Sequence, residues 1–171
     1  NLRWAIARQS VADRSATRVG VFVDGGCHHI GAKNIVQALE ESGVPCRLFD
    51  RAQMTRENFE NLDSFIVPGG YSFLEKIAAG KKGIDVMRGF VSRGGRYLGV
   101  CAGAYLASKD VLWEERNYPY PLELFDGTAE GALDHIAKWP NDTGVRVNLT
   151  DAGKKRGLQV AESRSFYYKG G

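Results

Sequence analysis

The sequence predicts an α/β protein with a central, mainly parallel β-sheet and helices on both faces of that sheet. Short apolar runs alternate with helical stretches four times within the first 108 residues, which is typical of a parallel sheet. Three of these runs end in glycine-rich corners, at residues 24–26, 68–70 and 101–103. The chain has 171 residues, of which 43% are hydrophobic and 25% charged, so it is long enough to bury a core and ordinary in composition.

The expected strands are short apolar runs bounded by turn signals. They lie at residues 18–24, 44–49, 64–67 and 97–100. Helices are expected between them, at residues 31–42, in a short stretch capped by Thr55, at residues 73–92 with a break near 80–83, and at residues 104–108. Continuous apolar runs such as residues 18–24 suit strands that are buried on both faces.

The two ends of the chain do not continue the alternation of strands and helices. Residues 1–16 predict an N-terminal helix or arm, and residues 118–121 an aromatic turn. The last third predicts a small antiparallel β addition, with strands expected at residues 145–149, 158–162 and 165–168 and a solvated hairpin turn at 154–156. No linker and no internal repeat divide the chain, so we expect a single domain over residues 1–171.

Charge and cysteine content exclude several classes of function. The net charge is only +3, and no basic stripe interleaved with aromatic residues is present, so nucleic acid binding is not expected. No apolar run approaches 18 residues, which argues against a membrane span. Three cysteines make neither a disulfide framework nor a zinc spacing. We therefore expect a cytoplasmic protein without metal or cofactor. Export stays open because the chain starts at Asn1, and a homo-oligomer stays open as well.

Residues 96–108 are the most informative stretch. An apolar run leads into Gly99-Val-Cys-Ala-Gly103 and then into a helix of small residues, which is the glycine-flanked elbow that carries a nucleophile in hydrolases. The glycines permit a strained corner packed closely against its neighbours. The positive end of the following helix favours a thiolate. Cys101 is therefore a candidate nucleophile, and the alternative is a buried structural cysteine.

Other side chains are expected near Cys101, because ligands of parallel sheets bind outside the carboxyl ends of the strands. Asp24, at the end of the first expected strand, is a candidate partner of the thiol because related cysteine folds have an acidic residue there, and the alternative is that it bonds to its own turn. The histidines are candidates for a base or a charge partner, and they are His28, His29 and His135. Tyr71 and Ser72 are expected to line the pocket. Cys27 is a candidate to pair with Cys101 in a disulfide or to resolve its oxidation, while Cys46 is expected in the core.

Four motifs resemble one family. They are Phe65-Ile-Val-Pro-Gly-Gly70, residues 99–108, Phe125-Asp-Gly127 and Tyr167-Tyr-Lys-Gly-Gly171, and they are similar to the biotin-protein ligase N-terminal-like domain within the class I glutamine amidotransferase-like superfamily. The resemblance spans about residues 19–171.

This resemblance implies a flavodoxin-like three-layer sandwich with Cys101 at the elbow. It also implies an oxyanion pocket formed by the backbone N–H groups of Gly70 and Ala102. We expect a substrate to be bound around these amides, by Gly69, Tyr71, Gly103 and His28.

Two departures limit the expected activity. The superfamily's enzymes complete a triad with a His-x-Glu segment, and the sequence up to Gly171 contains none. It also lacks the Gly-Arg-Gly-Arg type of loop that belongs to biotin ligation, so that activity is not expected. The sequence predicts a cysteine-dependent amidotransferase-like or hydrolase-like domain that acts on a small-molecule or peptide amide. The alternatives are an inactive binding or regulatory module and a thiol redox sensor.

Overall fold

The structure is a computed structural model, and it describes residues 18–138, 141–148, 150–155 and 164–169. The chain forms two compact units, which are described separately below. One comprises Asn1–Val111 with Asn117–Ala129, and the other comprises Leu112–Arg116 with Glu130–Gly171. The expected arm at residues 1–16 and the expected strand at residues 158–162 lie outside the described residues. That the chain is a single domain stays a prediction.

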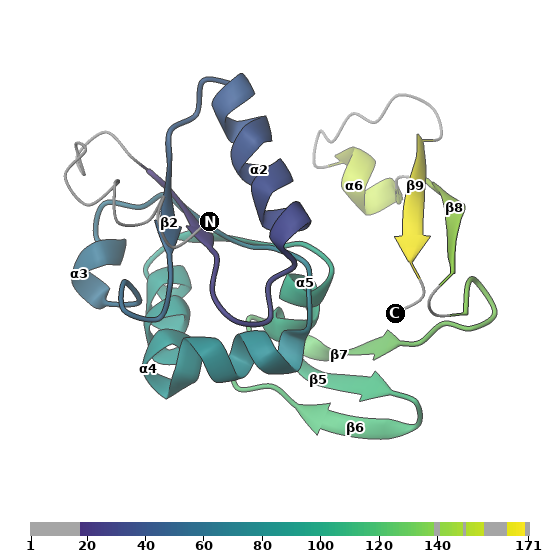
Figure 1. Ribbon diagram of the computed structural model, residues 1–171. Coiled ribbons are helices and arrows are strands. Elements are labelled where there is room, and N and C mark those ends of the chain that lie inside the picture. The colour runs from purple at the N-terminus through teal and green to yellow at the C-terminus, as the bar shows by residue number, and fades with distance from the viewer. Residues whose placement is uncertain (1–17, 139–140, 149, 156–163, 170–171) are drawn as a thin grey trace. The chain divides into compact units, whose positions relative to one another are not determined.

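The first unit contains a four-stranded parallel sheet, as predicted (Figure 1). Its strands are β1 (Val19–Phe22), β2 (Cys46–Phe49), β3 (Ser64–Val67) and β4 (Arg96–Gly99). The order is β2-β1-β3-β4, and every neighbouring pair is parallel. Among the described strands β4 therefore lies at one edge of the sheet, and its Leu98 is 54% exposed.

Helices cover both faces of this sheet. On one face, the strand residues Val21, Leu48 and Ile66 are buried together and pack against α2 (His29–Glu41). On the other face lie α3 (Arg56–Phe59) and α4 (Ser72–Ser92). There four phenylalanine rings pack with centroids 4.6–5.3 Å apart, and they come from β2, α3, β3 and α4: Phe49, Phe59, Phe65 and Phe90. The predicted three-layer sandwich is confirmed.

Two local signals in the sequence correspond to observed features. Thr55 caps α3, since its side-chain oxygen accepts a hydrogen bond from the Asn58 amide at 3.3 Å. Gly80 has φ 64° and ψ 173° within α4, a conformation that glycine adopts most readily. The break expected near residues 80–83 is therefore present at Gly80, where α4 is kinked between two helical segments, and the Arg51 guanidinium packs beside Gly80.

The chain beyond the elbow departs from the expectation in part. After α5 (Ala102–Ala107) come β5 (Ser108–Trp113), β6 (Arg116–Pro119) and β7 (Phe125–Gly131), which form a small sheet in the order β6-β5-β7. The aromatic turn expected at residues 118–121 was wrong at its start, because Tyr118 and Pro119 end strand β6. Pairing within this sheet outweighed the turn preference of the proline-rich sequence.

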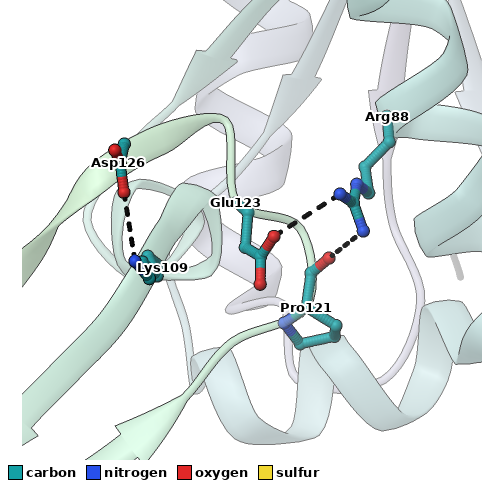
Figure 2. Close-up of polar contacts among 5 residues, drawn as sticks. All are labelled: Arg88, Lys109, Pro121, Glu123 and Asp126. Carbon is teal, nitrogen blue, oxygen red and sulfur yellow. Dashed lines mark hydrogen bonds and ion pairs between the residues drawn. The ribbon is translucent and has the colours of Figure 1, made fainter.

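The segment that follows β6 packs against α4. Tyr120 and Leu122 are buried. Figure 2 shows Arg88 of α4 donating to the Pro121 carbonyl at 3.3 Å and pairing with Glu123 at 3.4 Å, while Lys109 of β5 contacts Asp126 at 3.3 Å. These ion pairs are exposed and individually weak, so the two buried side chains contribute most to the attachment.

The second unit contains an antiparallel pair of strands, β8 (Asp142–Val147) and β9 (Arg164–Lys169), with Val145 opposite Phe166. This confirms the predicted antiparallel addition in the C-terminal third. The turn expected at residues 154–156 was wrong, since Lys154 and Lys155 belong to helix α6 (Asp151–Lys155), where Lys154 contacts Asp151. No helix within the described residues has the length and apolar character that a membrane crossing needs.

Candidate functional site

Cys101 stands at the corner between β4 and α5, where its thiol is exposed. Its backbone has φ 52° and ψ −112°, a conformation that a residue with a side chain rarely adopts. Such strain persists only where the surrounding structure enforces it, and it is frequent at functional sites. The chain therefore turns sharply from strand to helix at Cys101, and that this turn carries a nucleophile stays a prediction.

The two glycines that flank Cys101 are required by close backbone packing. A Cβ atom on Gly99 would lie 2.4 Å from the Gly103 carbonyl oxygen, and one on Gly103 would lie 2.3 Å from the Val67 carbonyl oxygen. Two hydrogen bonds also join this turn to the end of β3. The Val100 amide donates to Val67 O at 3.0 Å, and the Gly103 amide donates to Pro68 O at 3.2 Å. The spacing of the motif therefore follows from how tightly the corner packs on the end of β3.

The Gly69–Gly70 corner lies between the elbow and the loop that follows β1. A Cβ on Gly69 would lie 3.1 Å from the Cys101 Cβ, and one on Gly70 would lie 1.9 Å from the Gly26 carbonyl oxygen. The His28 amide donates to Gly69 O and the Tyr71 amide to Gly26 O, both at 2.8 Å. The structure thus brings together the three glycine-rich corners that the sequence placed at one rim.

Two backbone amides at this junction have no acceptor. Within the part of the chain that the structure describes, neither the Gly70 N–H nor the Ala102 N–H donates a hydrogen bond. Gly70 is half-buried and Ala102 is buried at the start of α5. The Ala102 amide belongs to the first turn of α5, where a helix leaves its N–H groups without intrahelical partners. Both amides could therefore donate to an acceptor atom of a ligand.

Asp24 is engaged by backbone groups. One carboxylate oxygen accepts from the Gly25 amide at 2.7 Å and the other from the Arg51 amide at 2.8 Å. These contacts match the turn-stabilising alternative for Asp24, and no contact with Cys101 is observed.

The rim residues Tyr71 and His28 are both exposed, Tyr71 to 65%. Their backbones take part in the bonds between the two corners. His29 is exposed as well, as the first residue of α2. His135 is exposed in the second unit, within a turn. Ser72 begins α4, and its hydroxyl bonds to the Tyr120 hydroxyl at 2.7 Å.

None of the three cysteines forms a disulfide. The Cys27 sulfur lies 3.6 Å from the Phe22 carbonyl oxygen and 3.8 Å from a Glu75 carboxyl oxygen. Burial raises the pKa of the Cys27 thiol, and the charge and hydrogen bond of Glu75 raise it further. Cys46 is only half-buried, packed at the margin of the core cluster beneath α2.

Glu75 is a residue of this region that the sequence analysis missed. It lies in the first turn of α4 and has no exposed surface. Burial raises the pKa of its carboxyl to about 8, and the Cys27 hydrogen bond offsets part of that effect. A helical pattern could have revealed it, because Glu75 precedes the buried Ala79 by four residues and Gly83 by eight.

Tyr97 of β4 completes this buried group. Its hydroxyl donates to the Gly103 carbonyl oxygen at 2.7 Å and so ties the strand to the elbow helix. Its pKa is raised by burial and by the nearby Glu75 and Cys27. Among the described residues, no group of three histidine, cysteine, aspartate or glutamate side chains could hold a metal ion.

The fold and the site define an α/β sandwich with an exposed cysteine at the turn between β4 and α5. A family model described as biotin-protein ligase, N terminal, matches residues 48–171, and the chain belongs to that family. This confirms the resemblance found in the sequence motifs.

Two relatives support the wider superfamily. The phosphoribosylformylglycinamidine synthase subunit PurQ of Koribacter versatilis (strain Ellin345) is 29% identical over 110 residues, which cover 61% of this chain and 42% of that protein. A solved structure described as a glutamine amidotransferase aligns with a TM-score of 0.59 and 24% identity, over 75% of this chain and 62% of the other. The chain thus spans less than two thirds of either relative, and the second likeness shows the fold alone.

Proposed function

We propose that this amidotransferase-like domain cleaves the C–N bond of an amide, with Cys101 as the nucleophile. The observation that carries this proposal is the position of one exposed, strained cysteine between two corners whose Gly70 and Ala102 amides have no acceptor among the described residues. An acyl transfer needs a nucleophile and hydrogen-bond donors directed at the developing oxyanion. We propose that Cys101 supplies the nucleophile and that the Gly70 and Ala102 amides supply the donors.

In the proposed reaction the Cys101 thiol loses its proton and its sulfur attacks the amide carbon. The carbonyl oxygen becomes an oxyanion that accepts hydrogen bonds from the Gly70 and Ala102 amides. The C–N bond then breaks, and the nitrogen departs as an amine or ammonia after taking up a proton. Water hydrolyses the resulting thioester, which releases a carboxylic acid and restores the thiol.

The substrate is proposed to be a small-molecule or peptide amide bound at the exposed rim. Tyr71 and His28 are proposed to contact it, because both are exposed and their backbones adjoin the Gly69–Gly70 corner. A glutamine amidotransferase is among the structural relatives, so glutamine is the first amide to test. Asparagine and a capped glutamine peptide extend the test to the other amides of this class.

The experiment measures ammonia release from these amides and covalent labelling by a glutamine-derived chloroketone, detected by intact mass. We expect the wild-type chain to be labelled once, at Cys101, and Cys101→Ser to lose both labelling and ammonia release. For the rim, His28→Ala should weaken labelling while the neighbouring His29→Ala should not. Labelling no faster in the wild type than in Cys101→Ser would reject the proposal and favour a binding or regulatory module.

A further inference from the structure

Glu75 places a carboxyl group in the interior without a counter-charge. The side chain is fully buried, one carboxyl oxygen lies 3.8 Å from the Cys27 sulfur, and the other has no hydrogen-bond partner. No lysine or arginine among the described residues pairs with it. An ionised carboxylate in such a place is strongly unfavourable, so Glu75 is more stable there as the neutral acid.

Glu75 packs against Gly26, in the loop that bonds to the corner carrying the Gly70 amide. A Cβ on Gly26 would lie 2.4 Å from the Glu75 nitrogen and 2.9 Å from its Cγ. On the other side of Gly26, its carbonyl oxygen accepts from the Tyr71 amide at 2.8 Å. Gly26 is therefore packed between Glu75 and the Gly69–Gly70 corner, so a displacement of Glu75 would reach that corner through backbone contact.

Among the described residues, the titratable groups whose pKa Glu75 shifts are all acids, while Lys76, the next residue of α4, has its ammonium 4.7 Å from the centre of the Tyr120 ring. The loop after β1 contributes Cys27 and, further out, Asp24, β4 contributes Tyr97, and the segment after β6 contributes Tyr120. The proximity of Glu75 raises the pKa of Cys27, Tyr97 and Tyr120. None of these acids can neutralise a negative charge, so ionisation of Glu75 would leave its charge uncompensated.

We propose that Glu75 is a positioning residue that holds the Gly26 and Gly70 corner in place as an uncharged acid, and that loss of its proton loosens this corner and withdraws the Gly70 amide from Cys101. The inference rests on the proposed function only in that Gly70 serves there as an oxyanion donor. The proton passes to solvent, and no covalent bond changes. The corner should therefore respond to mild alkali, because burial raises the pKa of Glu75 to about 8.

The first test is independent of activity. In the full chain labelled with ¹⁵N-glycine, the Gly26 and Gly70 amide resonances should move in one step near pH 8. Glu75→Gln keeps the shape of the neutral acid and cannot ionise, so its resonances should stay at the acid-form positions. Glu57→Gln, a change at an exposed glutamate of α3, should keep the step. The same pH dependence in wild type and Glu75→Gln would overturn the proposal.

A wild-type measurement covers the case in which Glu75→Gln does not fold. With ¹³C-labelled glutamate, one carboxyl resonance should titrate near pH 8 together with the Gly70 amide. If every glutamate carboxyl titrates in the ordinary range near 4.5, the proposal fails.

The second test asks whether ionisation of Glu75 changes the reactivity of Cys101. We take the ratio of two rates of Cys101 labelling, the rate with the glutamine-derived chloroketone divided by the rate with iodoacetamide. Dividing by the iodoacetamide rate corrects for the ionisation of the thiol. This ratio should fall about 10-fold between about pH 7 and pH 9 in wild type, because the protonated fraction of a group with a pKa of about 8 falls by that factor and an oxyanion donor typically contributes more than that. It should stay level in Glu75→Gln. A level ratio in wild type would overturn the link to Cys101. If the chloroketone never labels the chain while the Gly70 resonance still titrates, the proposed function fails and the positioning role of Glu75 stands.

Discussion

Gly69 lies directly against Cys101, since a Cβ atom on Gly69 would stand 3.1 Å from the Cys101 Cβ and 3.6 Å from its sulfur. A contact of 3.1 Å is tighter than ordinary packing, so an added methyl group would have to displace the cysteine by a few tenths of an ångström. Because Gly69 has no side chain, the space beside it is open for the Cys101 thiol.

Gly69→Ala should slow the alkylation of Cys101, because the added methyl crowds the sulfur and shifts a strained corner. Overpacking of this kind typically costs about 1–3 kcal/mol. The rate should fall more for a bulky maleimide than for iodoacetamide. Gly31→Ala is the matched control, since nothing lies within 4 Å of its added Cβ. Equal alkylation rates in the two variants would show that Gly69 does not shape access to the thiol.

The buried acid predicts a dependence of stability on pH. The pKa of Glu75 is raised from 4.5 to about 8 in the folded chain, so the folded state keeps a proton that the unfolded state releases. This contribution to stability is complete below about pH 4.5, falls by up to about 1.4 kcal/mol per pH unit, and is lost above about pH 8. Urea unfolding from pH 5 to pH 9 should show wild type losing stability relative to Glu75→Gln until about pH 8 and running parallel to it above. A constant difference across this range would contradict the raised pKa.

Tyr97→Phe should destabilise the elbow. The change removes the hydroxyl that donates to the Gly103 carbonyl at 2.7 Å, and such a hydrogen bond contributes about 0.5–1.5 kcal/mol to folding. Tyr118→Phe is the control, because Tyr118 is 39% exposed and should lose much less. The free energy of unfolding in urea measures both, and an equal loss in the two variants would argue against a specific role for the Tyr97 hydroxyl.

Phe59→Ala should cost about 3–5 kcal/mol of unfolding free energy, the range typical of a deleted core phenylalanine. Its ring contacts three other rings, Phe49, Phe65 and Phe90, and it is 1% exposed. Phe73→Ala provides the comparison, since Phe73 is 56% exposed. Thermal unfolding of both variants should separate them clearly, and similar melting temperatures would mean that the aromatic cluster contributes little to the core.

The parallel sheet was predictable because its signals are local. Residues 64–67 form an apolar run that ends in Pro68-Gly-Gly70, and the strand has those same bounds. Thr55 caps a helix with its own side-chain oxygen, and the backbone of Gly80 tolerates positive φ. Features of this kind need little information from the rest of the fold.

The missed features depend on contacts between distant residues. Glu114 and Glu115 join β5 to β6 with φ of 47° and 63°, although glycine and asparagine are the usual residues there, so no sequence signal marked the turn. Glutamate is almost never fully buried, and only its place on the inward face of α4 puts Glu75 in the core. For Asp24 the sequence offered two interpretations, and the Arg51 amide that favours one of them comes from 27 residues away.

The position of β4 at the edge of the described sheet has a practical consequence. Its outer backbone groups have no neighbouring strand among those described, while Leu98 and the following Val100 are 54% and 41% exposed. An open, apolar strand edge is a template on which a second chain can add, and charged side chains are the usual protection against this. Arg96 at the beginning of β4 is the strand's single charge, so within the described residues this edge has little of the usual protection, and a lysine in place of Leu98 should reduce aggregation during concentration or refolding.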